Sequence, residues 1–119
     1  MHSFFKSFTY ARAGILFCLR QRNFKIQSVC AAICIGLCLY LQVEKHDFLM
    51  IGFLCLLVLV LEMINTALEH LCNVYSTEIS PEIKIVKDVA AGAVLVASIF
   101  SLIMGIIIFT PYILLKFNL

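Results

Sequence analysis

Three long stretches of this chain carry few charged residues or none. The first lies between Lys25 and Glu44, the second starts at Phe48, and the third starts at Val89. A helix needs roughly 20 apolar residues to cross the hydrocarbon core of a bilayer. Hydrophobic residues make up 63% of the 119-residue sequence and charged residues only 13%. A soluble domain of this size could not bury so much apolar surface, so the sequence predicts an integral membrane protein.

The predicted fold is all-α, a single membrane-embedded domain covering residues 1–119. Three transmembrane helices are expected, over residues 26–43, 48–70 and 89–115. Pro111 should bend or end the third of them, because proline lacks the backbone N–H that a helix interior uses. Residues 1–24 are expected to form an amphipathic helix in the membrane interface, with aromatic side chains on one side and basic ones near its edge. An irregular basic tail is the alternative.

The basic residues predict how the chain is oriented. Most of them precede the first span, at Lys6, Arg12, Arg20, Arg22 and Lys25, and no acidic residue accompanies them. Cytoplasmic loops of membrane proteins carry an excess of lysine and arginine. The N-terminus and the loop over residues 73–88 are therefore expected in the cytoplasm. The net charge of +2 does not indicate a nucleic-acid partner.

Five of the six cysteines lie within or beside the apolar runs, and three of them, Cys30, Cys34 and Cys38, are spaced four apart. A free cysteine behaves as a small hydrophobic residue, so packing is the expected role. A thiol cluster on one helical stripe is the alternative. The sequence has no CxxC pair of the kind that binds a metal.

Polar residues interrupt the end of the second span, in the sequence LEMINTALEH over residues 61–70. Glu62, Asn65, Thr66 and Glu69 are spaced so that they share one face of a helix. Carboxylates inside a span are costly and usually face a bundle interior or a water-filled site. Glu69 could simply lie at the water interface, but that explanation is weaker for Glu62, which is more than a turn deeper.

A helix face with two carboxylates and an amide suits phosphoryl transfer. Carboxylates at a membrane rim can hold Mg²⁺, which brings phosphates, and a second carboxylate can accept the proton of an attacking hydroxyl. An amide can orient either group, and Lys87, beside Asp88, can meet the phosphate charge at the same membrane face. The sequence contains neither a Walker-type GxxxxGK[ST] loop nor a kinase glycine-rich loop. The residues alone leave proton or cation transport open.

The motifs narrow the choice further. LEMINTALEH followed by KDVAAGAVLVA resembles the prokaryotic diacylglycerol kinase family, and the upstream SFTYARAG and QRNFKIQ fit it too. RNFKIQ and KDVAAGAV look closer to its undecaprenol kinase branch. The resemblance implies a homotrimeric lipid kinase of the bacterial cytoplasmic (inner) membrane. It would transfer the γ-phosphate of MgATP to the hydroxyl of a membrane lipid, undecaprenol or diacylglycerol.

The resemblance also implies roles for single residues. Glu62 matches the catalytic base and Asn65 a polar residue needed beside it. Glu69 and Gln21 match metal-binding positions, although many members have a glutamate where Gln21 stands. The residues that match contacts to the nucleotide are Tyr10, Gln21, Glu69, Glu78, Ile79, Ser80, Lys87 and Asp88. Those assigned to the lipid substrate are Glu62, Asn23, Phe24 and Lys25.

Two other functions remain open at this point. A small ion-coupled transporter would also use an acid pair within a span, although it would place the acids nearer the bilayer midplane than this chain does. A catalytically silent assembly subunit would explain Gln21 and also Asn73, which stands where an aspartate is common in the family.

Overall fold

A computed structural model describes residues 2–75 and 80–119 of the chain, which form four α-helices. Their bounds are α1 His2–Leu19, α2 Arg22–Leu41, α3 Lys45–Tyr75 and α4 Pro81–Lys116. The all-α fold predicted from the sequence is confirmed.

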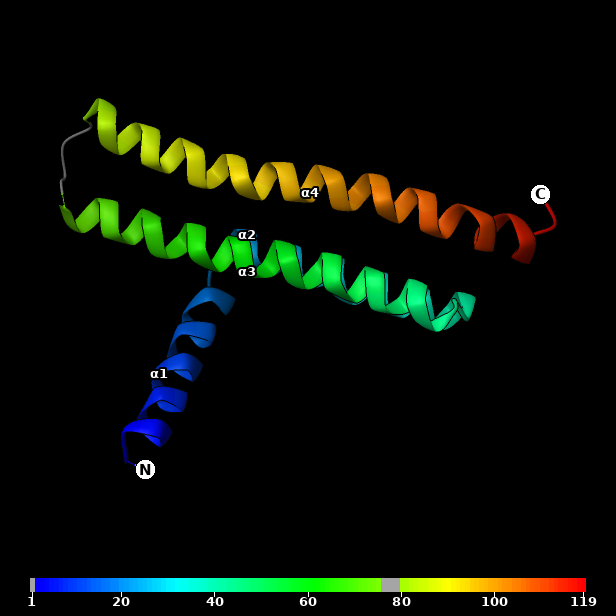
Figure 1. Ribbon diagram of the computed structural model, residues 1–119, viewed down its shortest axis with the longest axis horizontal. Coiled ribbons are helices and arrows are strands. Elements are labelled where there is room, and N and C mark those ends of the chain that lie inside the picture. Colours follow the sequence, from blue (N-terminus) through cyan, green and yellow to red (C-terminus); the bar gives the residue numbers. More distant parts are fainter. Residues whose placement is uncertain (1, 76–79) are drawn as a thin grey trace.

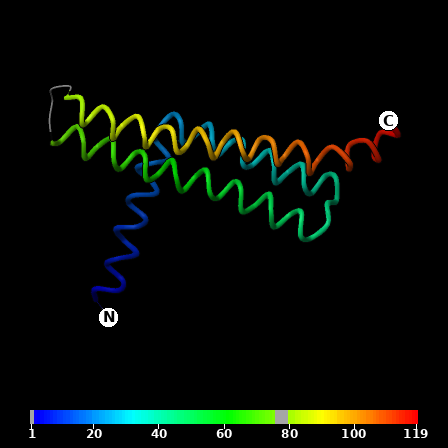
Figure 2. Tube along the Cα trace, turned by 45° about the horizontal axis from the view of Figure 1, so that its top comes forward, coloured from blue at the N-terminus to red at the C-terminus, as the bar shows by residue number. Residues whose placement is uncertain are grey.

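The three long helices form an elongated bundle. α3 and α4 run antiparallel, side by side, and α2 packs mainly against α3 (Figures 1 and 2). Among the described residues, these three helices are long and apolar enough to cross a membrane. Few of their side chains are buried within the chain, and large hydrophobic residues are exposed along all three. That exposure fits helices that face lipid.

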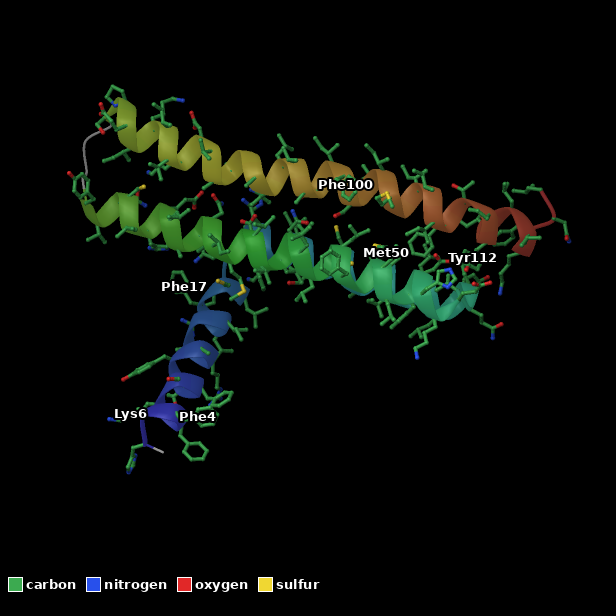
Figure 3. All side chains as sticks on the ribbon, in the orientation of Figure 1. Phe4, Lys6, Phe17, Met50, Phe100 and Tyr112 are labelled. Carbon is green, nitrogen blue, oxygen red and sulfur yellow. The ribbon has the colours of Figure 1, made fainter. Side chains whose placement is uncertain are left out.

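α1 leaves the bundle at a steep angle, and its free end lies away from the other helices (Figure 1). Phe4 and Lys6 are on this distant part, while Phe17 lies near α3 (Figure 3). The Phe17 ring meets the His70 ring edge-on, with 5.0 Å between centroids. α1 ends at Leu19 rather than near residue 24, and the residues that follow already belong to α2.

Local chemistry explains where the helices start and stop. The Ser80 hydroxyl caps α4 by accepting a hydrogen bond from the Ile83 N–H at 3.2 Å, and Pro81 takes the first helical position, where no N–H is needed. Gln42 ends α2 in the left-handed conformation, with φ of 52°. α4 does not end at Pro111 but continues to Lys116.

A group of contacts joins the helices at the end of the bundle where α2 turns into α3 and α4 ends. Cys38, Leu41, Ile51 and Phe109 form a buried apolar cluster, which we call the end cluster. Beside it, the Tyr112 hydroxyl donates to the Asp47 carboxylate and accepts from the Glu44 N–H at 3.1 Å (Figure 3). These contacts hold the C-terminal part of α4 against the turn between α2 and α3.

Candidate functional site

The polar residues of the LEMINTALEH sequence lie on the inner face of α3. Glu62, Asn65 and Thr66 are buried, and Glu62 and Asn65 are each only 5% exposed. Glu69, two turns beyond Glu62, is exposed. The predicted spacing therefore places a buried carboxylate at one end of this face and a solvent-facing one at the other.

These side chains open into a groove between α2, α3 and α4 with a volume of about 360 Å³. We call it the carboxylate groove, and its lining residues are Asn23, Ile26, Gln27, Glu62, Asn65, Glu69, Ala91, Val94, Leu95 and Ser98. Two carboxylates and two kinds of neutral polar group thus face one groove, which apolar side chains also line.

Hydrogen bonds within α3 organise the polar side chains. The Asn65 Nδ2 donates to the Glu69 Oε1 at 3.4 Å, which links the two ends of the face. The Thr66 hydroxyl donates to the backbone carbonyl of Glu62 at 2.9 Å, so it supports the helix rather than facing a ligand. The Asn65 Oδ1 is buried and has no hydrogen-bond partner among the described residues. A buried acceptor without a partner is costly, so this oxygen is available to a bound group.

The donor set fits a magnesium ion. Mg²⁺ prefers oxygen ligands and is commonly held by one or two carboxylates together with water and substrate phosphates. Glu69 and the Asn65 Oδ1, which has no partner among the described residues, supply such oxygens to one groove. Over residues 2–75 and 80–119, no three His, Cys, Asp or Glu side chains form a cluster that could hold a metal on their own. The groove accordingly suits an ion that arrives with phosphate oxygens.

The second part of the predicted site lies where α3 ends and α4 begins. The Lys87 Nζ donates to the Asn73 Oδ1 at 2.7 Å and so bridges the two helices. Asp88 pairs with Lys84 one turn earlier on α4. Both pairs are near the connection between α3 and α4, the end of α3 at which Glu69 also lies.

The other predicted residues have different positions. Gln21 lies in the short break between α1 and α2 and does not line the carboxylate groove, whereas Asn23, two residues later, does. Phe24 is buried and Lys25 is exposed in the first turns of α2. Tyr10 is 71% exposed on α1. Ser80 caps α4, while Glu78 and Ile79 lie outside the described residues.

Two polar residues of the groove were not predicted. Gln27 comes from α2 and Ser98 from α4. Each lies in a stretch counted as a transmembrane span, where a lone polar side chain is a signal for an inward-facing position. Sequence spacing alone could not show that these two residues, on different helices, face Glu62.

The fold and the site together describe a helical membrane protein. A groove lined by carboxylate and amide side chains lies close to one end of its membrane-spanning helices. The sequence matches the family described as Prokaryotic diacylglycerol kinase over residues 9–109. The chain belongs to this family, and it is therefore a lipid kinase of the diacylglycerol and undecaprenol kinase group.

Relatives with assigned functions agree with the match. The chain is 37% identical to the undecaprenol kinase of Bacillus subtilis (strain 168) over 116 residues, which cover 93% of this chain and 91% of the relative. It is 38% identical to a diacylglycerol kinase of Synechocystis over 101 residues, 83% of this chain and 58% of that protein. A diacylglycerol kinase of Helicobacter pylori is 34% identical over 100 residues, 81% of this chain and 76% of the relative.

Proposed function

We propose that this protein transfers the γ-phosphate of MgATP to the hydroxyl of a membrane lipid, with the carboxylate groove as the reaction site. The observation that carries the proposal is the burial of Glu62 at 5% exposure in a groove that also contains Glu69 and Asn65. A lipid hydroxyl is a poor nucleophile until a base removes its proton. Glu62 is the base we assign to that step.

The remaining groups position the reactants. Asn65 orients Glu69 through its Nδ2 and offers its free Oδ1 to a bound group. Glu69 and Asn65 would hold the metal, and Gln21 is assigned a supporting place there. When bound, Mg²⁺ would neutralise phosphate charge, which is the main requirement of phosphoryl transfer.

The nucleotide is assigned to the end of the bundle where α4 begins. Lys87 already holds its ammonium group between two helices, and it carries the positive charge that the phosphates require. The start of α4 adds the positive end of a helix dipole. The other residues proposed to contact ATP are Tyr10, Gln21, Glu69, Glu78, Ile79, Ser80 and Asp88.

The lipid alcohol would reach Glu62 from the side of α2. Asn23 lines the groove, and Phe24 and Lys25 follow it at the start of the same helix. Lys25 is exposed and Phe24 is buried, a combination that suits the boundary between headgroups and hydrocarbon. We assign these three residues to the lipid.

We further propose a homotrimer in the bacterial inner membrane, with the N-terminus and residues 73–88 in the cytoplasm. One copy leaves most of its apolar helix surface and one side of the groove uncovered. Small residues Ala90, Ala91, Gly92 and Ala93 would permit close helix approach. Crosslinking in mild detergent tests this assembly, and a product that is monomer alone would contradict it.

The experiment that tests the activity uses purified protein in lipid nanodiscs with γ-labelled MgATP. Undecaprenol and diacylglycerol are supplied in separate reactions, and the label is followed into the lipid fraction. Label in at least one phospholipid product is the expected result. Its absence with both lipids would overturn the proposed function and would favour a transporter or a silent subunit.

A further inference from the structure

A second hollow adjoins the carboxylate groove inside the bundle. It has a volume of about 300 Å³ and lies between α2, α3 and α4. We call it the chain cavity, and it is lined by Gln27, Cys30, Ala31, Cys34, Ile51, Leu54, Cys55, Val58, Ser98, Ser101, Leu102 and Gly105. None of these lining residues is charged. Most of the side chains that α2 and α4 contribute to this lining are small.

The two hollows share part of their lining. Gln27 and Ser98 line both the carboxylate groove and the chain cavity, so the apolar space adjoins the groove that Glu62 lines. The lining also includes Ile51, which belongs to the end cluster. Between Gln27 and Cys34 the rise along α2 is about 10 Å at 1.5 Å per residue.

The shared lining bears on what the cavity can hold. A lipid alcohol has its hydroxyl at one end and hydrocarbon directly behind it. With the hydroxyl at Glu62, the first part of the hydrocarbon would lie where Gln27 and Ser98 form the junction. The volume is at the lower end of the range for ligand pockets, which runs from roughly 300 to 1,000 Å³. The space is therefore suited to one chain rather than two side by side.

We propose that the chain cavity holds a single hydrocarbon chain of the lipid alcohol, the part next to the reacting hydroxyl, and so determines which alcohols the enzyme accepts. The inference rests on the proposed function. It favours alcohols with one chain. Diacylglycerol branches into two chains close to its hydroxyl, so one of its chains would have to stay outside the cavity.

Gly105 offers a direct test because a Cβ added there meets no atom within 4 Å. Gly105→Leu therefore adds a side chain to a residue that lines the cavity, starting from a Cβ that has room. Gly36→Leu is the matched control, since Gly36 also has free space around it but lines neither hollow. Ala31→Leu fills the same cavity from α2 and serves if the first variant does not fold.

The measurement compares kcat/KM for two single-chain alcohols with MgATP in nanodiscs, one long and one too short to reach Gly105. We expect Gly105→Leu to lower kcat/KM for the long alcohol by at least about tenfold, because pockets discriminate a single methylene by roughly 10–200-fold. The kcat/KM for the short alcohol and the KM for ATP should be unchanged. The Gly36→Leu control should have the wild-type kcat/KM for both alcohols. Equal losses for both alcohols, or no loss, would overturn the inference while leaving the kinase activity in place.

A second readout does not depend on turnover. A long-chain alcohol with a diazirine near its hydroxyl should crosslink to residues of the chain cavity in the wild type, and the yield should fall in Gly105→Leu. A phospholipid bearing the same diazirine should not label the cavity. Equal labelling by that phospholipid would show that bulk lipid fills the space and would contradict the proposal. Failure of the wild type to phosphorylate any alcohol would instead count against the proposed function.

Discussion

At the scale of single residues, the site depends on where the helix geometry places each polar group. Glu62 and Asn65 are buried within α3, while Glu69 faces outward and is tied to Asn65 by a hydrogen bond. The charge of a buried carboxylate acts more strongly on a neighbouring hydroxyl, because little water is present to screen it. An exposed carboxylate is better placed to exchange a metal with the solvent. One helix face thus provides two different chemical environments for the same functional group.

Gln21 gives the first test at this scale. If it supports the metal site, Gln21→Glu adds a carboxylate, which Mg²⁺ prefers to an amide oxygen. The Mg²⁺ concentration needed for half-maximal activity should then fall. The check is a Mg²⁺ titration of activity at fixed ATP for both proteins. An unchanged requirement would place Gln21 outside the metal site.

Lys87 gives the second test at the scale of single residues. Lys87→Met keeps the length of the side chain but removes its charge, so the phosphates lose a charged partner. Hydrogen bonds to charged groups contribute about 1.5–3 kcal/mol, which predicts a rise of at least roughly tenfold in the KM for ATP. Lys116→Met, at the opposite end of α4, is the control and should leave that KM unchanged. An unaltered KM in Lys87→Met would remove this lysine from the nucleotide site.

At the scale of helices, the two ends of the bundle differ. The end near Glu69 contains the polar site, while the other end is fastened by the end cluster and by the contacts of Tyr112 with Asp47 and Glu44. The second set holds the start of α3 and the last turns of α4 in place. These contacts therefore limit how far α4 can move against α2 and α3, the other two helices that line the groove.

Tyr112→Phe should weaken that attachment. The variant leaves the ring but removes the hydroxyl that donates to Asp47 and accepts from the Glu44 N–H. We expect a lower Tm in detergent, by a few degrees, with the helical content retained. Tyr10→Phe removes an exposed hydroxyl from α1 and should leave the Tm unchanged. Equal Tm values for the wild type and Tyr112→Phe would mean that the hydroxyl does not stabilise the bundle.

The helices could be predicted from the sequence because uncharged apolar runs are long and continuous. The exact ends of the helices could not be predicted. α3 extends to Tyr75, beyond the apolar run, and α4 begins at Pro81, well ahead of Val89, because helices can continue past the hydrocarbon into water. Pro111 was expected to bend or end the last helix, and it does not end it, since α4 continues to Lys116.

The site was only partly predictable. Glu62, Asn65 and Glu69 could be grouped because helical spacing is a property of one segment. Gln27 and Ser98 could not be placed beside them, since their proximity depends on how three helices pack. The chain cavity was missed for the same reason, because a hollow arises from small residues on separate helices.

At the scale of the whole molecule, the chain looks incomplete when taken alone. Large hydrophobic side chains remain exposed over α2, α3 and α4, and α1 extends away from them (Figure 1). A bilayer would cover much of this surface, and the proposed homotrimer would cover more of it.

The central claim is that Glu62 activates a lipid hydroxyl for phosphorylation, and Glu62→Gln tests it most directly. The measurement is the rate of γ-phosphate transfer from MgATP to the accepted lipid, with ATP affinity determined separately by equilibrium binding. Glu44→Gln, an exposed carboxylate at the opposite end of the bundle, is the control. The account predicts that Glu62→Gln loses about 10²–10⁴-fold in rate, as expected when a general base is removed, while ATP affinity is retained. Transfer at the wild-type rate in Glu62→Gln would contradict it.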